Sequence, residues 1–284
     1  FPAGNIFVSA DYSQLELRLL AHFSGDTVLR SILNSGQDVF TSIAVAWNKI
    51  PHTQLANALV VLSSTAEDRE IEVRISVTFE LRQRAKQICY GMIYGMGARA
   101  LAEQLEVEES VAVSFMASFN KAYPGVKKFL AETIAKCRRQ GYVETLQGRR
   151  RYLPAITGSN SLQKSHAERQ AVNSTIQGSA ADVAKRAMVL VEQRLSKKFP
   201  PSSPRKTYNP CTKVKGKRER PNERAASLVL QLHDELLYEV SDKHVTEAVA
   251  IIKSGMEEAV KLSVKLPVKV KTGNSWGALR EIPL

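Results

Sequence analysis

The sequence predicts an α+β fold in which long helices alternate with a few short strands. Apolar residues at helical spacing predict three long helical stretches, at 80–96, 110–140 and 165–195. Short apolar or alternating runs predict four strands, at 6–8, 228–232, 236–240 and 264–270. Acidic residues, Asp11 and Asp234, follow two of these strands, where a sheet can present carboxylates to a cleft.

Composition narrows the possible classes of protein. The chain has 284 residues, 44% of them hydrophobic, which suits one large domain or two tightly packed ones. No apolar run approaches 18 residues, so no membrane-spanning helix is predicted. Three widely spaced cysteines exclude a disulfide framework and a Cys-based zinc site. The chain opens on Phe1-Pro2 without a signal sequence, and we interpret it as an excised domain.

The net charge of +12 is concentrated in one segment. Residues 196–224 contain 10 Lys or Arg, two Asp or Glu and five Pro, a local charge of +8. This composition predicts a disordered basic insertion, either an arm that touches phosphates or a solvated loop. A second insertion, at 55–77, could form a helix and a strand or a loop, and the sequence assigns it no function.

The first group of candidate functional residues is acidic and consists of Asp11, Asp234 and Glu235. Mg²⁺ prefers oxygen ligands and is usually held by one or two carboxylates together with substrate phosphates. If the two strands are neighbours, Asp11 and Asp234 could share a pair of metal ions. The alternative is that both aspartates only form turns, which is common at strand ends.

The second group recurs every four residues on one predicted helix and consists of Arg82, Lys86, Tyr90 and Tyr94. This spacing places them on one face, which extends over roughly 18 Å at 1.5 Å per residue. That length matches a nucleoside triphosphate, with the cations at the phosphates and the tyrosines at the sugar and base. The alternative is an amphipathic helix with two core tyrosines and a solvated cationic edge.

The third group consists of Arg169, Asn173 and Gln177, again at steps of four on a helix. All three side chains can donate hydrogen bonds, and the minor-groove edge of every base pair offers acceptors. The stripe could therefore recognise the shape of a base pair without reading its sequence. The alternative is an ordinary solvated helix face.

These groups, taken together, resemble the motifs of the A-family DNA polymerases. The resemblance lies in five stretches that occur in family order: Asp11 to Arg18, Arg82 to Gly95, Gly148 to Pro154, Arg169 to Gln177, and His233-Asp234-Glu235. It covers nearly the whole chain except the two insertions. The amino-acid sequence at 85–91, 231–240 and 260–266 is most similar to that of the theta branch of the family.

The resemblance implies a right-hand polymerase fold with an antiparallel palm sheet, helical fingers and no thumb. The implied boundaries are palm at 1–50, an insertion and approach to the fingers at 51–79, fingers at 80–147, and palm again at 148–284 with the basic insertion at about 196–224. The missing thumb and upstream domains would belong to the same parent chain.

The resemblance also implies a role for individual residues. Asp11 and Asp234 would hold two Mg²⁺ ions with the carbonyl of Tyr12, and Glu235 would be an accessory catalytic carboxylate. Lys86 would bind the triphosphate and act as a general acid. The remaining implied substrate contacts are Arg82, Tyr90, Tyr94, Glu16 and Gln14. The implied DNA contacts are Arg169, Asn173, Gln177, His233, Arg149 and Arg150.

The function implied is template-directed addition of dNTPs to a primer 3′-hydroxyl, with release of pyrophosphate. The implied partners are primer-template DNA and dNTPs, without a membrane, and the implied setting is nuclear DNA repair, including end joining and lesion bypass. One alternative is a single-subunit RNA polymerase, which Glu16 and the two tyrosines disfavour. The other is a non-catalytic DNA-binding module, which the intact Asp11 and Asp234 disfavour.

Overall fold

The structure is a computed structural model that describes residues 4–48, 79–200 and 225–282. The chain divides into two compact units. The sheet unit comprises residues 1–16 and 180–284, and the helical unit comprises residues 17–179. Along the described residues, no helix is both long enough and apolar enough to cross a lipid bilayer.

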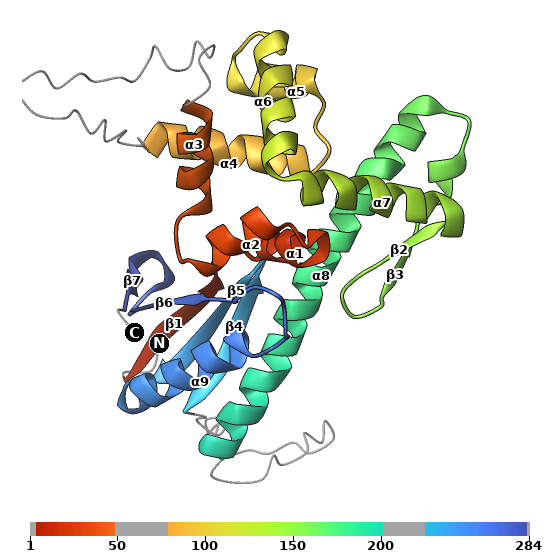
Figure 1. The fold of residues 1–284 in the computed structure, drawn as a ribbon. Helices are drawn as coiled ribbons and strands as arrows, with labels where there is room; N and C mark the ends of the chain where they lie inside the picture. Colours follow the sequence, from red (N-terminus) through yellow and green to blue (C-terminus); the bar gives the residue numbers. More distant parts are fainter. Residues whose placement is uncertain (1–3, 49–78, 201–224, 283–284) are drawn as a thin grey trace, which may run out of the picture. The chain divides into compact units, whose positions relative to one another are not determined.

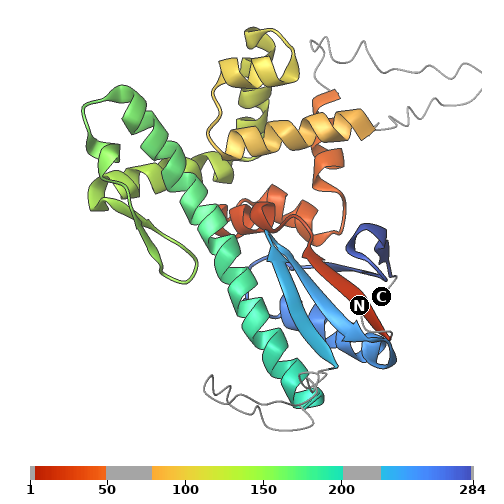
Figure 2. The same cartoon turned by 180° about the vertical axis from the view of Figure 1, so that it is seen from behind.

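The sheet unit is built on a five-stranded sheet in the order β4-β5-β1-β6-β7. Its elements are β1 (Asn5–Tyr12), β4 (Ala226–Leu232), β5 (Glu235–Ser241), α9 (Val245–Glu257), β6 (Val268–Gly273), the 3₁₀ helices η3 (Asp242–His244) and η4 (Trp276–Ala278), and β7 (Arg280–Glu281). Each strand pairs antiparallel to its neighbours. The helix α9 packs on one face of the sheet and lies in front of it in Figure 1 and behind it in Figure 2.

The central strand β1 separates the core from the predicted site. Val8, Ala10 and Tyr12 alternate along β1 and are buried, and the Tyr12 hydroxyl donates a 2.6 Å hydrogen bond to the carbonyl of Met256 in α9. Because side chains alternate along a strand, Asp11 must point to the opposite face. Phe7 and Ser9 share that face and are also buried, so β1 is covered on both faces and Asp11, near its end, is half-buried.

Within the described residues, the helical unit contains seven α-helices, one 3₁₀ helix, a small hairpin and the first half of a long helix. Its elements are α1 (Leu15–Ser24), α2 (Thr27–Asn34), α3 (Val39–Asn48), α4 (Phe79–Ile93), α5 (Ala98–Leu105), α6 (Glu109–Ala122), α7 (Pro124–Gln140), β2 (Tyr142–Glu144), β3 (Arg150–Tyr152), the 3₁₀ helix η2 (Pro154–Thr157) and α8 (Ser161–Lys198). The helix α1 begins in the sheet unit, and α8 continues into it.

Local chemistry sets several helix ends in this unit. Asp26 caps α2, because its Oδ1 accepts a hydrogen bond from the amide of Leu29 at 3.0 Å. Its Oδ2 accepts a second bond from the amide of Gly125, at the start of α7. Pro124 occupies the first turn of α7, and Gly141 ends that helix with a left-handed φ of 79°. The predicted helical stretch at 110–140 is therefore divided into α6 and α7 at Pro124.

The β2–β3 hairpin is docked on α8 by three polar contacts. Ser179 accepts a bond from the amide of Leu146, Arg149 donates to the carbonyl of Gly178, and Arg151 donates to the hydroxyl of Ser174, each at 2.8 Å. Figure 2 shows the hairpin beside the upper half of α8. At residue 178, a Cβ would lie 2.6 Å from the side chain of Thr145, so glycine is required for this close approach.

Several predicted element boundaries differ from the structure. The predicted strand at 264–270 is wrong in its first part, because β6 begins at Val268, directly after Pro267, which has no amide hydrogen to donate to the sheet. The strand predicted at 236–240 begins one residue earlier in the structure, since Glu235 already belongs to β5. The helix α8 extends to Lys198, beyond the predicted start of the basic insertion at 196.

Other predictions lie partly or wholly outside the described residues. The insertion at 55–77 and residues 201–224 of the basic insertion fall there. The elements α1, α2, α3 and α9, together with the β2–β3 hairpin, were not predicted from the sequence. The boundaries between the two compact units lie after residues 16 and 179. The boundaries predicted for palm and fingers stay a prediction.

Candidate functional site

The sheet unit brings the two predicted metal-binding aspartates to one end of the sheet. The Cα of Asp11 is paired with that of Glu235 in the antiparallel register of β1 and β5. Asp234 precedes Glu235 in the hairpin turn, and its main-chain carbonyl accepts a 3.3 Å hydrogen bond from the amide of Tyr12. The strand register therefore gathers three acidic residues at one end of two neighbouring strands.

Burial and neighbouring negative charge oppose ionisation of Asp11 and Asp234. Burial, together with the charges of Asp234 and Glu235, raises the pKa of Asp11 to about 6, although Lys271 and Lys269 act in the opposite direction. Burial also raises the pKa of Asp234, and the charge of Glu235 adds to that increase. This end of the sheet thus carries negative charge at a cost that a bound cation would relieve.

Glu235 is held by two residues that sequence reasoning missed. Its Oε1 accepts a 2.6 Å hydrogen bond from the hydroxyl of Ser9 and a longer one, 3.4 Å, from the indole nitrogen of Trp276. Ser9 lies two residues before Asp11 on β1 and therefore shares its face of the sheet. That two-residue spacing could have indicated Ser9 from the sequence. Trp276 lies far away in the sequence, and no local pattern connects it to Glu235.

The chemistry of these donors fits a divalent cation. Among the described residues, no three His, Cys, Asp or Glu side chains converge as a ready-made metal cluster. Mg²⁺ is nevertheless usually bound by one or two carboxylates, with substrate oxygens completing its shell. Asp11 and Asp234 provide such a pair. The side chain of Tyr12 is bonded to α9, so any role of Tyr12 as a ligand rests on its main-chain carbonyl.

Three further predicted residues lie close in sequence to the carboxylates. Gln14 connects β1 to α1 with a φ of 57°, and His233 opens the β4–β5 turn with a φ of 52°. This left-handed region is uncommon for residues other than glycine, and such conformations cluster at functional sites. Glu16 lies in the first turn of α1, where a negative charge also favours the helix dipole.

The helix α4 presents the predicted nucleotide-binding residues on its more accessible face. Lys86 is exposed, whereas Arg82, Tyr90 and Tyr94 are partly exposed. The opposite face of α4 is buried and carries Ala85, Ile88, Cys89 and Met92. Tyr90 and Tyr94 are therefore not core residues, which was the alternative interpretation of this stripe. Tyr94 lies just beyond the end of α4, although its amide still donates to the carbonyl of Tyr90.

The charge of Arg82 is paired with an aspartate that was not predicted. The Nε and Nη2 atoms of Arg82 donate to Oδ2 of Asp38 at 2.8 and 2.5 Å. The guanidinium carbon also lies 5.4 Å from the ring centre of Phe40. The ring of Phe40 is 6.0 Å from that of Tyr90, which is itself 6.0 Å from the ring of Tyr94. The cationic and aromatic parts of the α4 face are thus linked through the start of α3.

Gly95 connects the end of α4 to the predicted stripe on α8. It has a φ of 72°, and a Cβ there would lie 3.0 Å from Cγ of Arg169. The side chain of Arg169 therefore passes directly over the Gly95 backbone, next to Tyr94. This contact brings the second and third predicted groups together within the helical unit.

The three residues of the α8 stripe differ in environment. Arg169 and Gln177 are exposed, whereas Asn173 is half-buried. The side-chain oxygen of Asn173 is buried without a hydrogen-bond partner among the described residues, which is unfavourable unless a bound molecule or water satisfies it.

Two serines of α8 bond back to their own helix. The hydroxyls of Ser174 and Ser179 donate to carbonyls four residues earlier, a pattern that commonly bends helices.

The predicted DNA contacts Arg149 and Arg150 both already bond to other residues of the helical unit. Arg149 donates to the carbonyl of Gly178, and so fastens the hairpin to α8. Arg150 forms an ion pair with Glu144 and lies over the ring of Tyr142 at 4.6 Å. Both arginines are exposed, so contacts with phosphates would add to these bonds or replace them.

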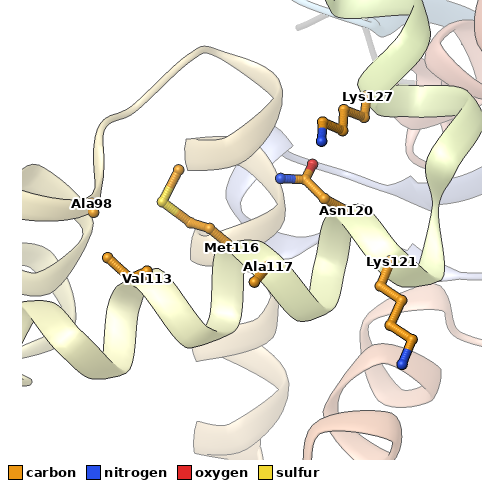
Figure 3. A pocket seen from close by; sticks show the side chains of 7 residues that line it. All are labelled: Ala98, Val113, Met116, Ala117, Asn120, Lys121 and Lys127. Atoms are coloured by element: carbon orange, nitrogen blue, oxygen red, sulfur yellow. The ribbon is translucent and has the colours of Figure 1, made fainter.

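A cavity of about 570 Å³ lies on the helical unit, apart from all predicted site residues. It is lined from the start of α5, from α6 and from the start of α7. Figure 3 shows Asn120 and Lys127 pointing into the same space and Lys121 pointing away from it. The other lining side chains are Ala98, Val113, Met116 and Ala117, so the cavity has few polar groups to select a ligand.

The predicted functional residues thus form two groups, one in each compact unit. The acidic residues belong to the sheet unit, and the α4 face and α8 stripe belong to the helical unit. A family model described as "DNA polymerase family A" matches residues 1–59 and 61–278. This match includes every residue that the sequence singled out for catalysis, nucleotide binding or DNA binding.

Individual relatives and one solved structure agree with this match. The chain is 45% identical to DNA polymerase theta of Mus musculus over 99% of its length, and 35% identical to the thermostable DNA polymerase I of Thermus thermophilus over 96%. It spans 10% and 27% of those proteins, respectively. The POL domain of Pol1 from M. smegmatis, in complex with DNA primer-template and dNTP, matches 98% of the chain and 41% of that domain's chain, with a TM-score of 0.78 at 32% identity.

Proposed function

Since this chain belongs to DNA polymerase family A, we propose that it carries the nucleotide-addition site of a template-directed DNA polymerase. The reaction joins a primer 3′-hydroxyl to the α-phosphate of a dNTP and releases pyrophosphate. The observation that carries this proposal is the placement of Asp11 and Asp234 at adjoining strand ends, where burial raises the pKa of both carboxyl groups.

Asp11 and Asp234 would hold two Mg²⁺ ions in this site, with the main-chain carbonyl of Tyr12. When bound, the ions would promote deprotonation of the attacking hydroxyl and neutralise charge on the phosphates. The contribution of the chain is to fix the two carboxylates on a rigid strand pair, so that they need no rearrangement during the reaction. Glu235, held by Ser9, would act as an accessory carboxylate.

The α4 face would bind the incoming nucleotide. Arg82 and Lys86 would contact the triphosphate, and the Nζ of Lys86 would donate a proton to the departing pyrophosphate. Cations at these positions stabilise the charge that develops during phosphoryl transfer. Tyr90 would pack on the sugar and base, and Tyr94 would lie near the templating base.

The remaining predicted residues would select the sugar and hold the DNA. Glu16 would exclude a 2′-hydroxyl, and Gln14 would contact the substrate. The proposed contacts with primer-template DNA are Arg169, Asn173, Gln177, His233, Arg149 and Arg150. The exposure of Arg169 and Gln177, and the unpaired oxygen of Asn173, support a bound partner along α8.

The parent protein would act in nuclear DNA repair, including end joining and lesion bypass. The 45% identity to the mouse protein named DNA polymerase theta supports this proposal. The chain would supply the palm at 1–50 and 148–284 and the fingers at 80–147. A thumb and upstream domains of the same parent polypeptide would complete the enzyme, in keeping with the 10% of the mouse protein that the chain spans.

Primer extension by the full polypeptide that carries this chain tests the proposal. We expect Asp234→Asn to lower the rate of dNTP addition more than about a thousandfold, which corresponds to about 4 kcal/mol in activation free energy. Glu239→Gln is the matched control, because Glu239 lies on β5, the strand that directly follows Asp234, and accepts a hydrogen bond from Asn5 toward the other end of the β1–β5 pair.

Unchanged extension by the Asp234→Asn variant would refute the metal-binding role. Preference for rNTPs over dNTPs in the wild-type protein would instead establish an RNA polymerase. Duplex binding without addition of either nucleotide would establish a non-catalytic DNA-binding module.

A further inference from the structure

The acidic side chain of Asp38 is fixed to the N-terminus of α3. Its Oδ1 accepts hydrogen bonds from the amides of Phe40 and Thr41 at 2.8 and 3.0 Å. An aspartate in this position satisfies amides that the helix leaves unpaired, and the helix dipole stabilises its charge. The carboxylate therefore has a defined position, set by the backbone of α3.

The second oxygen of this carboxylate holds Arg82. Both Nε and Nη2 of Arg82 donate to Oδ2, at 2.8 and 2.5 Å. Partial burial alone would raise the pKa of Asp38, but the bonds from Arg82 and from the α3 amides outweigh burial and lower it. One carboxylate thus joins α3 to the face of α4 that carries the cations.

The ring of Phe40 supports the same guanidinium. The guanidinium carbon of Arg82 lies 5.4 Å from the ring centre of Phe40, whose side chain is 2% exposed and therefore rigidly packed. Phe40 also contacts Tyr90, with ring centres 6.0 Å apart. Arg82 is thus held by a carboxylate and by an aromatic ring that lie two residues apart in the sequence.

A stabilising role alone does not explain this arrangement well. The side chains of Arg82 and Asp38 are each 32% exposed, and ion pairs at such partly exposed positions contribute little to folding. An arginine on a helix face, however, loses considerable rotamer freedom when it binds a ligand. A residue that restricts Arg82 in advance lowers that cost at the moment of binding.

We propose that Asp38 is a positioning residue that holds the guanidinium of Arg82 ready for the triphosphate of the incoming nucleotide. The inference rests on the proposed function, which places the triphosphate at Arg82. The contact with Asp38 uses the Nε–Nη2 edge of the guanidinium, and an arginine has donors on its other edge with which to meet a phosphate. Asp38 does not touch the substrate and acts through Arg82.

The opposite effect would also be physically reasonable. A carboxylate near the triphosphate could compete with it for Arg82, and its removal would then strengthen nucleotide binding. The two possibilities predict changes of opposite sign in the affinity for dNTP. The sign of that change therefore decides between positioning and competition.

The test uses single-nucleotide incorporation by the full polypeptide on primer-template DNA with Mg²⁺. Rates measured over a range of dNTP concentrations give an apparent Kd and a maximal rate. The variants are Asp38→Asn, Arg82→Ala and the double variant. Asparagine keeps an oxygen that can cap α3, so Asp38→Asn preserves the fold while it removes the charge.

Asp26→Asn is a matched control within the same unit. Asp26 also caps a helix through Oδ1 and accepts a second bond through Oδ2, but that bond comes from the amide of Gly125 and not from an arginine. We expect Asp38→Asn to raise the apparent Kd for dNTP about five- to tenfold, with the maximal rate within about twofold of wild type. The Asp26→Asn control should leave both quantities unchanged.

The double variant separates positioning from a general loss of structure. If Asp38 acts through Arg82, Asp38→Asn should cause no further loss in the Arg82→Ala background. An unchanged or lower Kd in Asp38→Asn would overturn the proposal, and so would an equal effect of Asp38→Asn without Arg82. If the wild-type protein adds no nucleotide, the proposed function fails. The sign of the Asp38→Asn effect is then read from calorimetric binding of dNTP with Mg²⁺.

Discussion

The acidic end of the sheet and the cationic face of α4 carry opposite charges, and only the second has its charge compensated by a partner of opposite sign. At the end of β1, burial and the charges of Asp234 and Glu235 raise the pKa of Asp11 to about 6. On α4, the charge of Arg82 is compensated by Asp38, and Lys86 is exposed to solvent. The end of the sheet is therefore electrostatically unfavourable in the absence of a cation, whereas the charge of Arg82 on the helix face is already compensated.

Among substitutions on the α4 face, that of Lys86 should change the rate of nucleotide addition most. Lys86→Ala removes the proposed general acid, and general acid catalysis typically contributes a factor of about 10² to 10⁴. We expect the maximal rate of nucleotide addition to fall within that range. Pre-steady-state incorporation measures it, with Gln87→Ala as a control at the neighbouring exposed position. Loss of affinity at an unchanged maximal rate would limit Lys86 to binding.

Tyr90→Phe should give a smaller effect that concerns selectivity rather than rate. A dideoxynucleotide lacks the 3′-hydroxyl, and the hydroxyl of Tyr90 could supply a polar group near that gap. One hydrogen bond contributes about 0.5–1.5 kcal/mol, so discrimination against ddNTPs should increase by up to about tenfold. The ratio of kcat/KM for ddNTP and dNTP reports this directly. An equal ratio in both proteins would mean that Tyr90 does not face the sugar.

Arg82→Ala should have the smallest effect when thermal stability alone is measured. The substitution leaves Asp38 without its partner, and we expect a loss of about 0.5–1 kcal/mol because the pair is partly exposed. Thermal unfolding without nucleotide and DNA is the measurement. A gain in stability would contradict the view that the α4 face is electrostatically satisfied.

The sequence predicted the positions of the candidate residues on strands and helices better than the contacts between them. Short apolar runs at 6–8 and 228–232, each followed by an acidic residue, were enough to predict Asp11 and Asp234 at strand ends. The four-residue spacing likewise placed Arg82, Lys86 and Tyr90 on one face of α4. Short periodic patterns of this kind are local, and they survive because burial of one face determines them.

The missed features depend on partners that are distant in the sequence. Asp38 and Arg82 are 44 residues apart, and no local pattern connects them. The contact between Trp276 and Glu235 spans 41 residues and could not be inferred either. The start of β6 was misplaced because alternation continues through Val264 and Leu266, which are buried without belonging to the strand. Alternation reports burial, and it does not report which backbone groups pair.

The raised pKa of Asp11 gives stability a definite dependence on pH. Below about pH 4, the carboxyl is protonated in both the folded and unfolded states and has no effect. As the pH rises from about 4 to about 6, Asp11 ionises in the unfolded chain but not yet in the folded one, and the free energy of unfolding therefore falls. At pH 7 the carboxyl is ionised in both states, and the whole loss of stability is present. Asp11 is half-buried, and solvent screening reduces this cost to about 1 kcal/mol.

The most direct test of the account pairs thermal unfolding with primer extension for Asp11→Asn. We predict that without Mg²⁺ this variant is more stable than wild type by about 1 kcal/mol at pH 7, that the gain disappears near pH 4, and that nucleotide addition is abolished. Such a result would show that the sheet end keeps an unfavourable charge for the sake of activity. A variant that is less stable at pH 7, or that still extends a primer, would contradict the account.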